Sequence, residues 1–240
     1  MRAILLIARR DLGSFLRTWS GYIIMAAVLA LLGLAFNAGV LGRGAQRSSE
    51  VLSNYFWWAS GFTMVESVLI SMRLLAEERQ TGTLALLYSS PVRDSEIVIG
   101  KFLSALGFLG LFLLITLYLP ALIFVHGKVS FGHIFAGYAG LFLLGSAILA
   151  VGTLGSALSK SQLVAVILSG CMVVGLLLTW WLVGVTERPL SSVFNALAPY
   201  PHFKPFQEGL FHLRDAVYFL LVTYVALFGA TRVLEARRWK

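Results

Sequence analysis

Few residues of this 240-residue chain are of types that could do chemistry together. Gly100-Lys101 matches two letters of the phosphate-binding loop, G-x-x-x-x-G-K-[ST], in which backbone N–H groups and a lysine hold a nucleotide's phosphates. The pattern fails at both ends, because position 95 is Ser and position 102 is Phe. The sequence therefore predicts no ATP site of this kind.

The histidines and the single cysteine give no recognisable site either. A metal site needs ligands that converge, and no two of the four histidines are spaced at i, i+4. Ser-His-Asp combinations mean nothing without geometry, so an intramembrane hydrolase has no supporting motif. We expect no metal site and no catalytic residue, and we expect Cys171 to be a small packing residue. The histidines are His126, His133, His202 and His212.

Glu66, in FTMVESVLI, is the one ionisable residue well inside an apolar run. Intramembrane carboxylates are costly, and they usually face protein or water. Glu66 is therefore a candidate to line a substrate path or to pair at a helix interface. The alternative is a local hydrogen bond, for example to Thr63, near a wet cleft.

The composition decides the class of protein. Hydrophobic residues make up 58% of the chain and charged residues only 12%, about half the charged share of a soluble domain. We therefore predict an all-α integral membrane protein, because the apolar runs are long and do not alternate as barrel strands do. The net charge is +8, and the Lys and Arg residues stand at the ends of these runs. Their placement indicates membrane orientation rather than nucleic-acid binding.

Six runs are long enough to span a bilayer, and they form one predicted domain, 1–240. The third and fourth are longer than needed, so they would tilt or extend beyond the bilayer. In the fourth, Ala136-x-x-x-Gly140 and Gly152-x-x-x-Ser156 permit close helix packing and could also serve a dimer. The runs are 20–41, 53–75, 97–125, 133–158, 162–184 and 214–234.

The first nineteen residues read as an amphipathic helix at the membrane interface, with arginines interspersed. We reject a cleaved signal peptide, because the apolar run that follows is long and five more spans come after it. The apolar positions at helical spacing are Ile4, Leu5, Ala8, Leu12, Phe15 and Leu16.

Counting Lys and Arg orients the chain. With the N-terminus inside, the inner segments hold thirteen basic residues and the outer segments six, which favours both termini in the cytoplasm. The outer segment 185–213 is rich in aromatics and is broken by four prolines, so we predict one or two short helices there rather than an ordinary loop. The same count places 77–96 on the cytoplasmic side.

Segment 77–96 is predicted to leave the membrane, turn and form a short docking helix. Gly82 allows a sharp turn, and Thr81 or Thr83 could cap the helix that follows. Leu84 to Tyr88 give about one and a half apolar turns before Pro91 ends them, and Asp94 or Ser95 could cap the next helix. Such an element would suit a groove on a cytoplasmic partner.

This segment resembles the coupling-helix region of ABC-2 type transporter permeases. The pattern is R-x-x-A-E-E-x-x-x-G-T-L-x-L-L-x-x-x-P-V-x-x-x-x-I-x-x-G-K, and Leu213-Arg214-Asp215 to Tyr218-Phe219 resembles the family's entry to the last span. Among its members, permeases of gliding motility and of nitrous-oxide-reductase maturation look most similar. The matching positions are Arg73, Glu77, Glu78, Gly82, Thr83, Leu84, Leu87, Pro91, Val92, Ile97, Gly100 and Lys101.

The resemblance implies an inner-membrane permease that exports a substrate and is not itself an enzyme. A cytoplasmic ABC ATPase would bind ATP and Mg and move the coupling helix, and a second permease copy or a paralogue would complete the pore. A second hypothesis is mechanical: the motion would reach a periplasmic accessory protein, with nothing translocated. The expected coupling residues are Glu77, Glu78, Thr81, Gly82, Thr83, Leu84, Leu87, Pro91 and Val92.

Overall fold

The structure is a computed structural model that describes residues 2–41, 47–83, 92–126, 130–188 and 190–238. The described residues form helices joined by short turns, and six candidate spans are long and apolar enough to cross a membrane, as predicted. The elements are α1 (Arg2–Arg17), α2 (Trp19–Ala35), η1 (a π-helix, Phe36–Leu41), α3 (Ser48–Ser71), α4 (Ala76–Gln80), α6 (Asp94–Thr116), α7 (Tyr118–His126), α8 (Phe131–Leu158), α9 (Gln162–Val183), α10 (Leu190–Leu197), α11 (Pro199–Gln207) and α12 (Leu213–Arg238).

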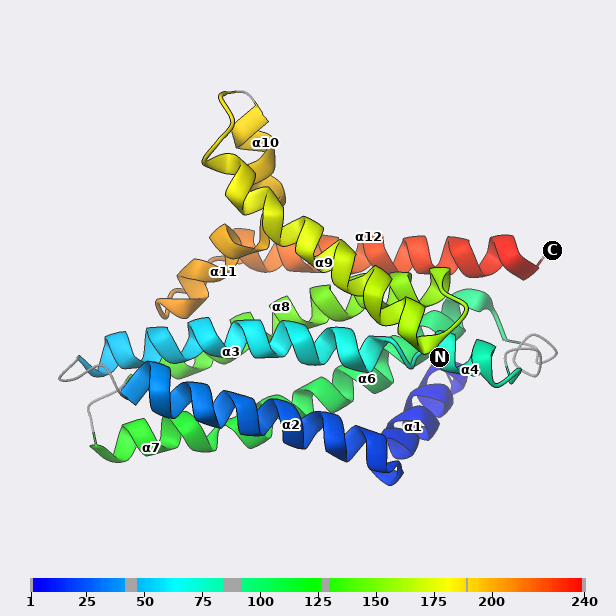
Figure 1. Cartoon of the computed structure of the whole chain (residues 1–240), viewed down its shortest axis with the longest axis horizontal. Helices are drawn as coiled ribbons and strands as arrows, with labels where there is room; N and C mark the ends of the chain where they lie inside the picture. The colour runs from blue at the N-terminus through cyan, green and yellow to red at the C-terminus, as the bar shows by residue number, and fades with distance from the viewer. Residues whose placement is uncertain (1, 42–46, 84–91, 127–129, 189, 239–240) are drawn as a thin grey trace.

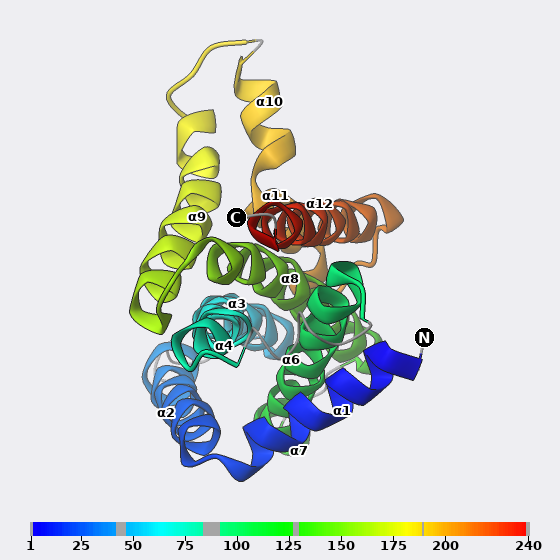
Figure 2. The same ribbon diagram turned by 90° about the vertical axis from the view of Figure 1, so that its right-hand side faces the viewer.

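The long helices α2, α3, α6, α8 and α12 run along the long axis of the molecule (Figure 1). Both chain ends lie at the same end of the long axis as α4, called here the α4 end, and α7 and α11 lie toward the other, called the α11 end. Figure 2 shows α12 nearly end-on but α1 lengthwise, so α1 crosses the direction of the bundle. This is the placement expected of an interfacial helix.

The predicted small residues of α8 pack within the chain. A Cβ added at Gly137, Gly145 or Gly152 would meet side chains of α3 at 2.9 Å or less. These side chains recur at nearly the same interval along α3, so two parallel helices touch over most of their length. The α3 partners are Phe56, Thr63 and Ser71.

The third predicted span is broken near its end. Helix α6 ends at Thr116 and α7 begins at Tyr118, because Pro120 has no N–H to donate to the Thr116 carbonyl. The hydroxyl of Tyr55, on α3, donates to that carbonyl at 3.5 Å instead. A side chain of a neighbouring helix thus satisfies the carbonyl that the proline leaves free.

Helix α1 is amphipathic, as predicted, and part of its apolar surface packs within the chain. Ile7 and Phe15 are buried against α6, whereas Leu5 is 66% exposed. Leu5, one of the predicted apolar positions, thus lies on a side of α1 that the chain leaves open, as a helix at the membrane interface would have it. Cys171, predicted to be a packing residue, is likewise exposed.

The segment before the last span forms two short helices, α10 and α11, as predicted. Helix α9 leaves α8 at an angle and α10 doubles back beside it, so this pair projects sideways from the bundle (Figure 2). None of the α10 residues is buried, whereas α11 buries Phe203 and Phe206 against α8 and its neighbours. Helix α11 is therefore packed against the bundle, whereas α10 is not.

Candidate functional site

The chain makes a sharp break between α3 and α4, in front of the predicted coupling segment. Ser156, on α8, fills the break: its hydroxyl oxygen accepts hydrogen bonds from the backbone N–H of Leu75 at 3.1 Å and of Ala76 at 3.0 Å. The N–H groups at the start of a helix have no partner within it. Ser156 therefore caps α4 from another helix.

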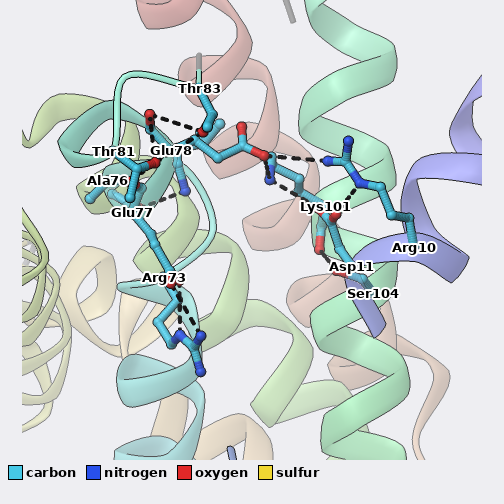
Figure 3. Close-up of polar contacts among 12 residues, drawn as sticks. Arg10, Asp11, Arg73, Ala76, Glu77, Glu78, Thr81, Thr83, Lys101 and Ser104 are labelled. Carbon is cyan, nitrogen blue, oxygen red and sulfur yellow. Dashed lines mark hydrogen bonds and ion pairs between the residues drawn. The ribbon is translucent and has the colours of Figure 1, made fainter. Parts of the chain in front are cut away.

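A buried cluster of charges ties α4 to α1 and α6 (Figure 3). The Lys101 side chain is 4% exposed, and its ammonium lies 2.7 Å from a Glu78 oxygen and 2.9 Å from an Asp11 oxygen. Arg10 joins the same carboxylates, at 2.8 Å from Asp11 and 3.4 Å from Glu78. Paired in this way, a lysine can be buried at moderate cost, whereas an isolated one could not.

The Arg10 guanidinium of this cluster stays charged through the neutral pH range. The hydrogen bond to Asp11 raises the pKa of Arg10 above its ordinary value; burial opposes this, and the negative charge of Asp11 and Glu78 adds to it. A base with a raised pKa keeps its contribution to stability until the pH rises through that pKa. For an arginine this lies far above neutrality.

Arg73 forms a second link, between the end of α3 and the start of α2. Its guanidinium pairs with Glu77 at 2.9 Å and donates to the Ser20 hydroxyl. It also lies 5.3 Å from the centre of the Phe15 ring, a cation–π distance. Glu77 and Glu78 thus face different partners, and together they hold α4 against three elements.

Helix α4 also forms hydrogen bonds with the turn between α8 and α9. The Arg79 guanidinium donates to the carbonyls of Ala157, at 3.1 Å, and Ser159. The Gln80 side-chain oxygen accepts from the N–H of Gln162 at 3.3 Å. Arg237, near the end of α12, donates to the Leu158 carbonyl at 2.7 Å, so the last helix joins the same turn.

Thr81 and Thr83 lie at the end of α4, just before the part of the coupling segment that the structure does not describe. Thr81 donates back to the Glu77 carbonyl at 2.9 Å and Thr83 to the Glu78 carbonyl at 3.3 Å, so both hydroxyls contact the end of α4, while the helix that they are predicted to cap lies outside the described residues. Gly82 has a φ of +74°, which confirms the predicted sharp turn, because this conformation favours glycine.

The remaining predicted coupling residues are only partly described. Leu84, Leu87 and Pro91 lie outside the described residues. Val92 packs against a small apolar cluster at the α4 end that contains Leu75 and Ile97. The predicted cap of the next helix is wrong, because Asp94 already lies inside α6. The capping residue is Arg93, and the Glu96 carboxylate accepts a hydrogen bond from its backbone N–H.

Glu66 is fully buried on α3, and neither of its carboxyl oxygens has a hydrogen-bond partner among the residues that the structure describes. The hydroxyl of Thr63, one turn away, is also buried and has no partner in this part of the chain. The predicted local hydrogen bond between them is therefore absent. Glu66 thus lies at a buried helix interface rather than beside a wet cleft, and its role in a substrate path stays a prediction.

The outer histidines have structural partners. His202 lies 2.7 Å from Asp215 and stacks on the Tyr218 ring at 4.0 Å, which ties α11 to α12. His133 contacts the Gln207 carbonyl at 2.8 Å. No group of three or more metal-binding side chains occurs in the part of the chain that the structure describes.

Sequence reasoning placed Glu77 and Glu78 in the coupling segment, but it predicted neither the helix α4 nor the contacts that hold it. Lys101 matched the family pattern, but nothing in the sequence indicated that it pairs with Glu78. Gly100 packs closely on Ile7, so Gly100-Lys101 belongs to the contact between α6 and α1 and not to a phosphate-binding loop. Ser156 stood in a small-residue pattern, but its hydroxyl serves α4. Asp11, the one acidic residue among the arginines of α1, was the signal that could have been found.

Comparison with known families matches residues 5–227 to the model of the ABC-2 family transporter protein. A comparison with curated proteins gave no match. The match covers nearly all of the helices described above, including α1, the break before α4 and most of the last span. The chain belongs to the ABC-2 transporter family and is a multi-pass membrane permease subunit.

Proposed function

We propose that a separate ABC ATPase drives this permease by moving α4 and the segment that follows it, up to residue 96. The carrying observation is the set of contacts from five-residue α4 to α1, α6, α8 and the α8–α9 turn. A force on such a short element reaches four others through ion pairs and buried hydrogen bonds. ATP and Mg would be held by the partner, which is consistent with the failed phosphate-loop pattern.

Export is the direction we propose, from the inner membrane with both termini in the cytoplasm. The excess of basic residues at the α4 end supports this orientation. The orientation is tested with Lys160→Cys and Lys204→Cys in a Cys171→Ser background. A membrane-impermeant maleimide on intact cells should label position 204 and not 160, and the reverse pattern would overturn the orientation.

The coupling proposal is tested by purifying the tagged chain from native membranes in mild detergent. We expect a P-loop ATPase to copurify and to hydrolyse ATP. Leu87→Asp should leave the permease folded but abolish coupled hydrolysis, because a charge would face an apolar groove. Val185→Asp, at an exposed apolar residue far from α4, is the control. A Leu87→Asp complex that assembles and responds like the unaltered one would contradict the proposal.

A second copy or a paralogue would complete the permease, as the family implies. The exposed apolar side chains of α9 and α10 support such a contact, among them Trp181 and Val193. The oligomeric state of the purified complex, measured by light scattering, tests this. A single permease per active complex would exclude it.

The mechanical alternative, as in gliding motility or metalloenzyme maturation, is supported by a polar groove of about 520 Å³ between α10, α11 and the start of α12. Its lining includes Asn195, His212 and Arg214, groups that suit a protein partner better than lipid. A photo-crosslinking amino acid at position 195 should capture one periplasmic protein in cells. Transport by the reconstituted permease and ATPase alone would favour export instead.

A further inference from the structure

Helix α1 carries a second polar surface on its exposed side, away from α6. Leu6, Arg9, Arg10, Gly13 and Arg17 recur at helical spacing and line a groove of about 600 Å³. Gly13 lies at its middle, where an added Cβ would meet nothing within 4 Å. The absence of a side chain there leaves open space between the arginines of successive turns.

The arginines of this groove are not all used by the protein. Arg10 pairs with Asp11 and Glu78. Arg9 and Arg17 are exposed, and neither has an acidic partner among the described residues. Two guanidinium groups two turns apart on one face thus remain free for an anion, and guanidinium groups suit phosphate in charge and geometry.

Leu6 is the apolar side chain that lines this groove, and further exposed apolar residues stand next to its lining residues in the sequence. Leu5 and Leu6 are 66% and 70% exposed, and Trp19, two residues after α1, is 84% exposed. Trp19 begins the first spanning helix, so this surface lies where a span meets the membrane boundary. Tryptophan is enriched at that boundary. A ligand here meets positive charge and apolar surface together.

We propose that this groove binds an anionic phospholipid, with Arg9 and Arg17 on the headgroup phosphate and Leu6 and Trp19 against the acyl chains. An acidic protein surface would satisfy the arginines but would leave the leucines and the tryptophan without apolar contact. A free phosphate ion would do the same. The phospholipid is the occupant that matches both halves of the surface.

Phosphatidylglycerol bound to the purified full-length chain, counted by native mass spectrometry in a neutral detergent, tests the proposal. Arg9→Gln with Arg17→Gln should weaken binding by roughly fivefold for each arginine, equivalent to about 1 kcal/mol each. Gly13→Leu should also lower binding, because it fills the groove without changing the charge. Lys160→Gln removes an equally exposed charge outside the groove and should leave binding unchanged.

The controls separate a site from diffuse attraction. Unchanged binding in the double variant, or an equal loss in Lys160→Gln, would overturn the proposal. A loss in the double variant without a loss in Gly13→Leu would show that charge attracts lipid without this groove. Displacement of the lipid by inorganic phosphate alone would reduce the site to a phosphate site. Unchanged lipid binding with lost ATPase assembly would assign the surface to a protein.

Discussion

The ammonium of Lys101 lies 2.7 Å from the carboxylate of Glu78, although one belongs to α6 and the other to α4. Asp11 of α1 completes the contact at 2.9 Å from the same ammonium. Three elements therefore share one nearly buried positive charge. No pair of them can move apart without exposing or isolating a charge.

Replacing Lys101 with Met should strongly destabilise this end of the protein. Two carboxylates would lose their main partner in a mostly buried place, and breaking such a pair typically costs about 3 kcal/mol or more. Thermal unfolding in detergent measures this. Lys101→Met combined with Glu78→Gln should recover part of the loss. If Lys101→Met unfolds at the temperature of the unaltered protein, the cluster does not hold α4.

Ser156→Ala should separate stability from coupling. It leaves the N–H groups of Leu75 and Ala76 buried without an acceptor, at an expected cost of about 1–3 kcal/mol. Ser146→Ala, on the same helix, is the matched control, because that hydroxyl only donates to the Leu143 carbonyl of its own helix. The unfolding temperature and the coupled ATP hydrolysis should both fall for Ser156→Ala and not for Ser146→Ala. Equal effects would refute the capping role.

The turn at Gly82 should tolerate Asn and reject Val. Its φ of +74° is accessible to Asn but is unfavourable for a β-branched residue. Among the described residues no atom lies within 4 Å of an added Cβ, so the cost that we expect is conformational. ATP hydrolysis by the assembled complex should survive Gly82→Asn and fall in Gly82→Val. If Val is as active as Asn, the conformation of this turn does not matter for coupling.

Glu66→Met should raise stability while lowering transport. The carboxyl makes no hydrogen bond to any described residue, so an apolar side chain of similar size loses no partner and avoids a desolvation cost of about 1–3 kcal/mol. A buried carboxyl that lowers stability is a candidate to act in another state of the permease, in which these helices separate and the carboxyl faces the substrate. Unfolding temperature and reconstituted transport measure the two effects. A stabilised variant with undiminished transport would reject the role of Glu66 in a substrate path.

Gly152→Ala should disrupt the contact between α8 and α3. The new Cβ would lie 2.0 Å from the Ser71 hydroxyl oxygen, and overpacking of this kind costs about 1–3 kcal/mol. Gly170→Ala, on α9, meets nothing within 4 Å and should be neutral or slightly stabilising. The difference between their unfolding temperatures tests the close packing. Two equal temperatures would contradict it.

The number and type of the spanning helices were predictable because membrane insertion depends on local properties. A run of about twenty apolar residues must form a helix in hydrocarbon, whatever its neighbours are. The amphipathic first helix, the Gly82 turn and the two helices in 185–213 follow from equally local rules. The break after Thr116 was also written in Pro120, although we did not predict it.

The contacts that hold α4 were not predictable, because they join positions far apart in the chain. Lys101 and Asp11 are 90 residues apart, and Ser156 is 80 residues from Ala76. A serine hydroxyl or a charge near a membrane boundary can simply be solvated by water. Nothing in its local sequence pattern shows that it will pair with a distant backbone N–H or carboxylate. Packing of α8 against α3 and of α1 against α6 brings these groups together and removes the water. Burial then makes each pairing necessary, and burial is a property of the folded chain.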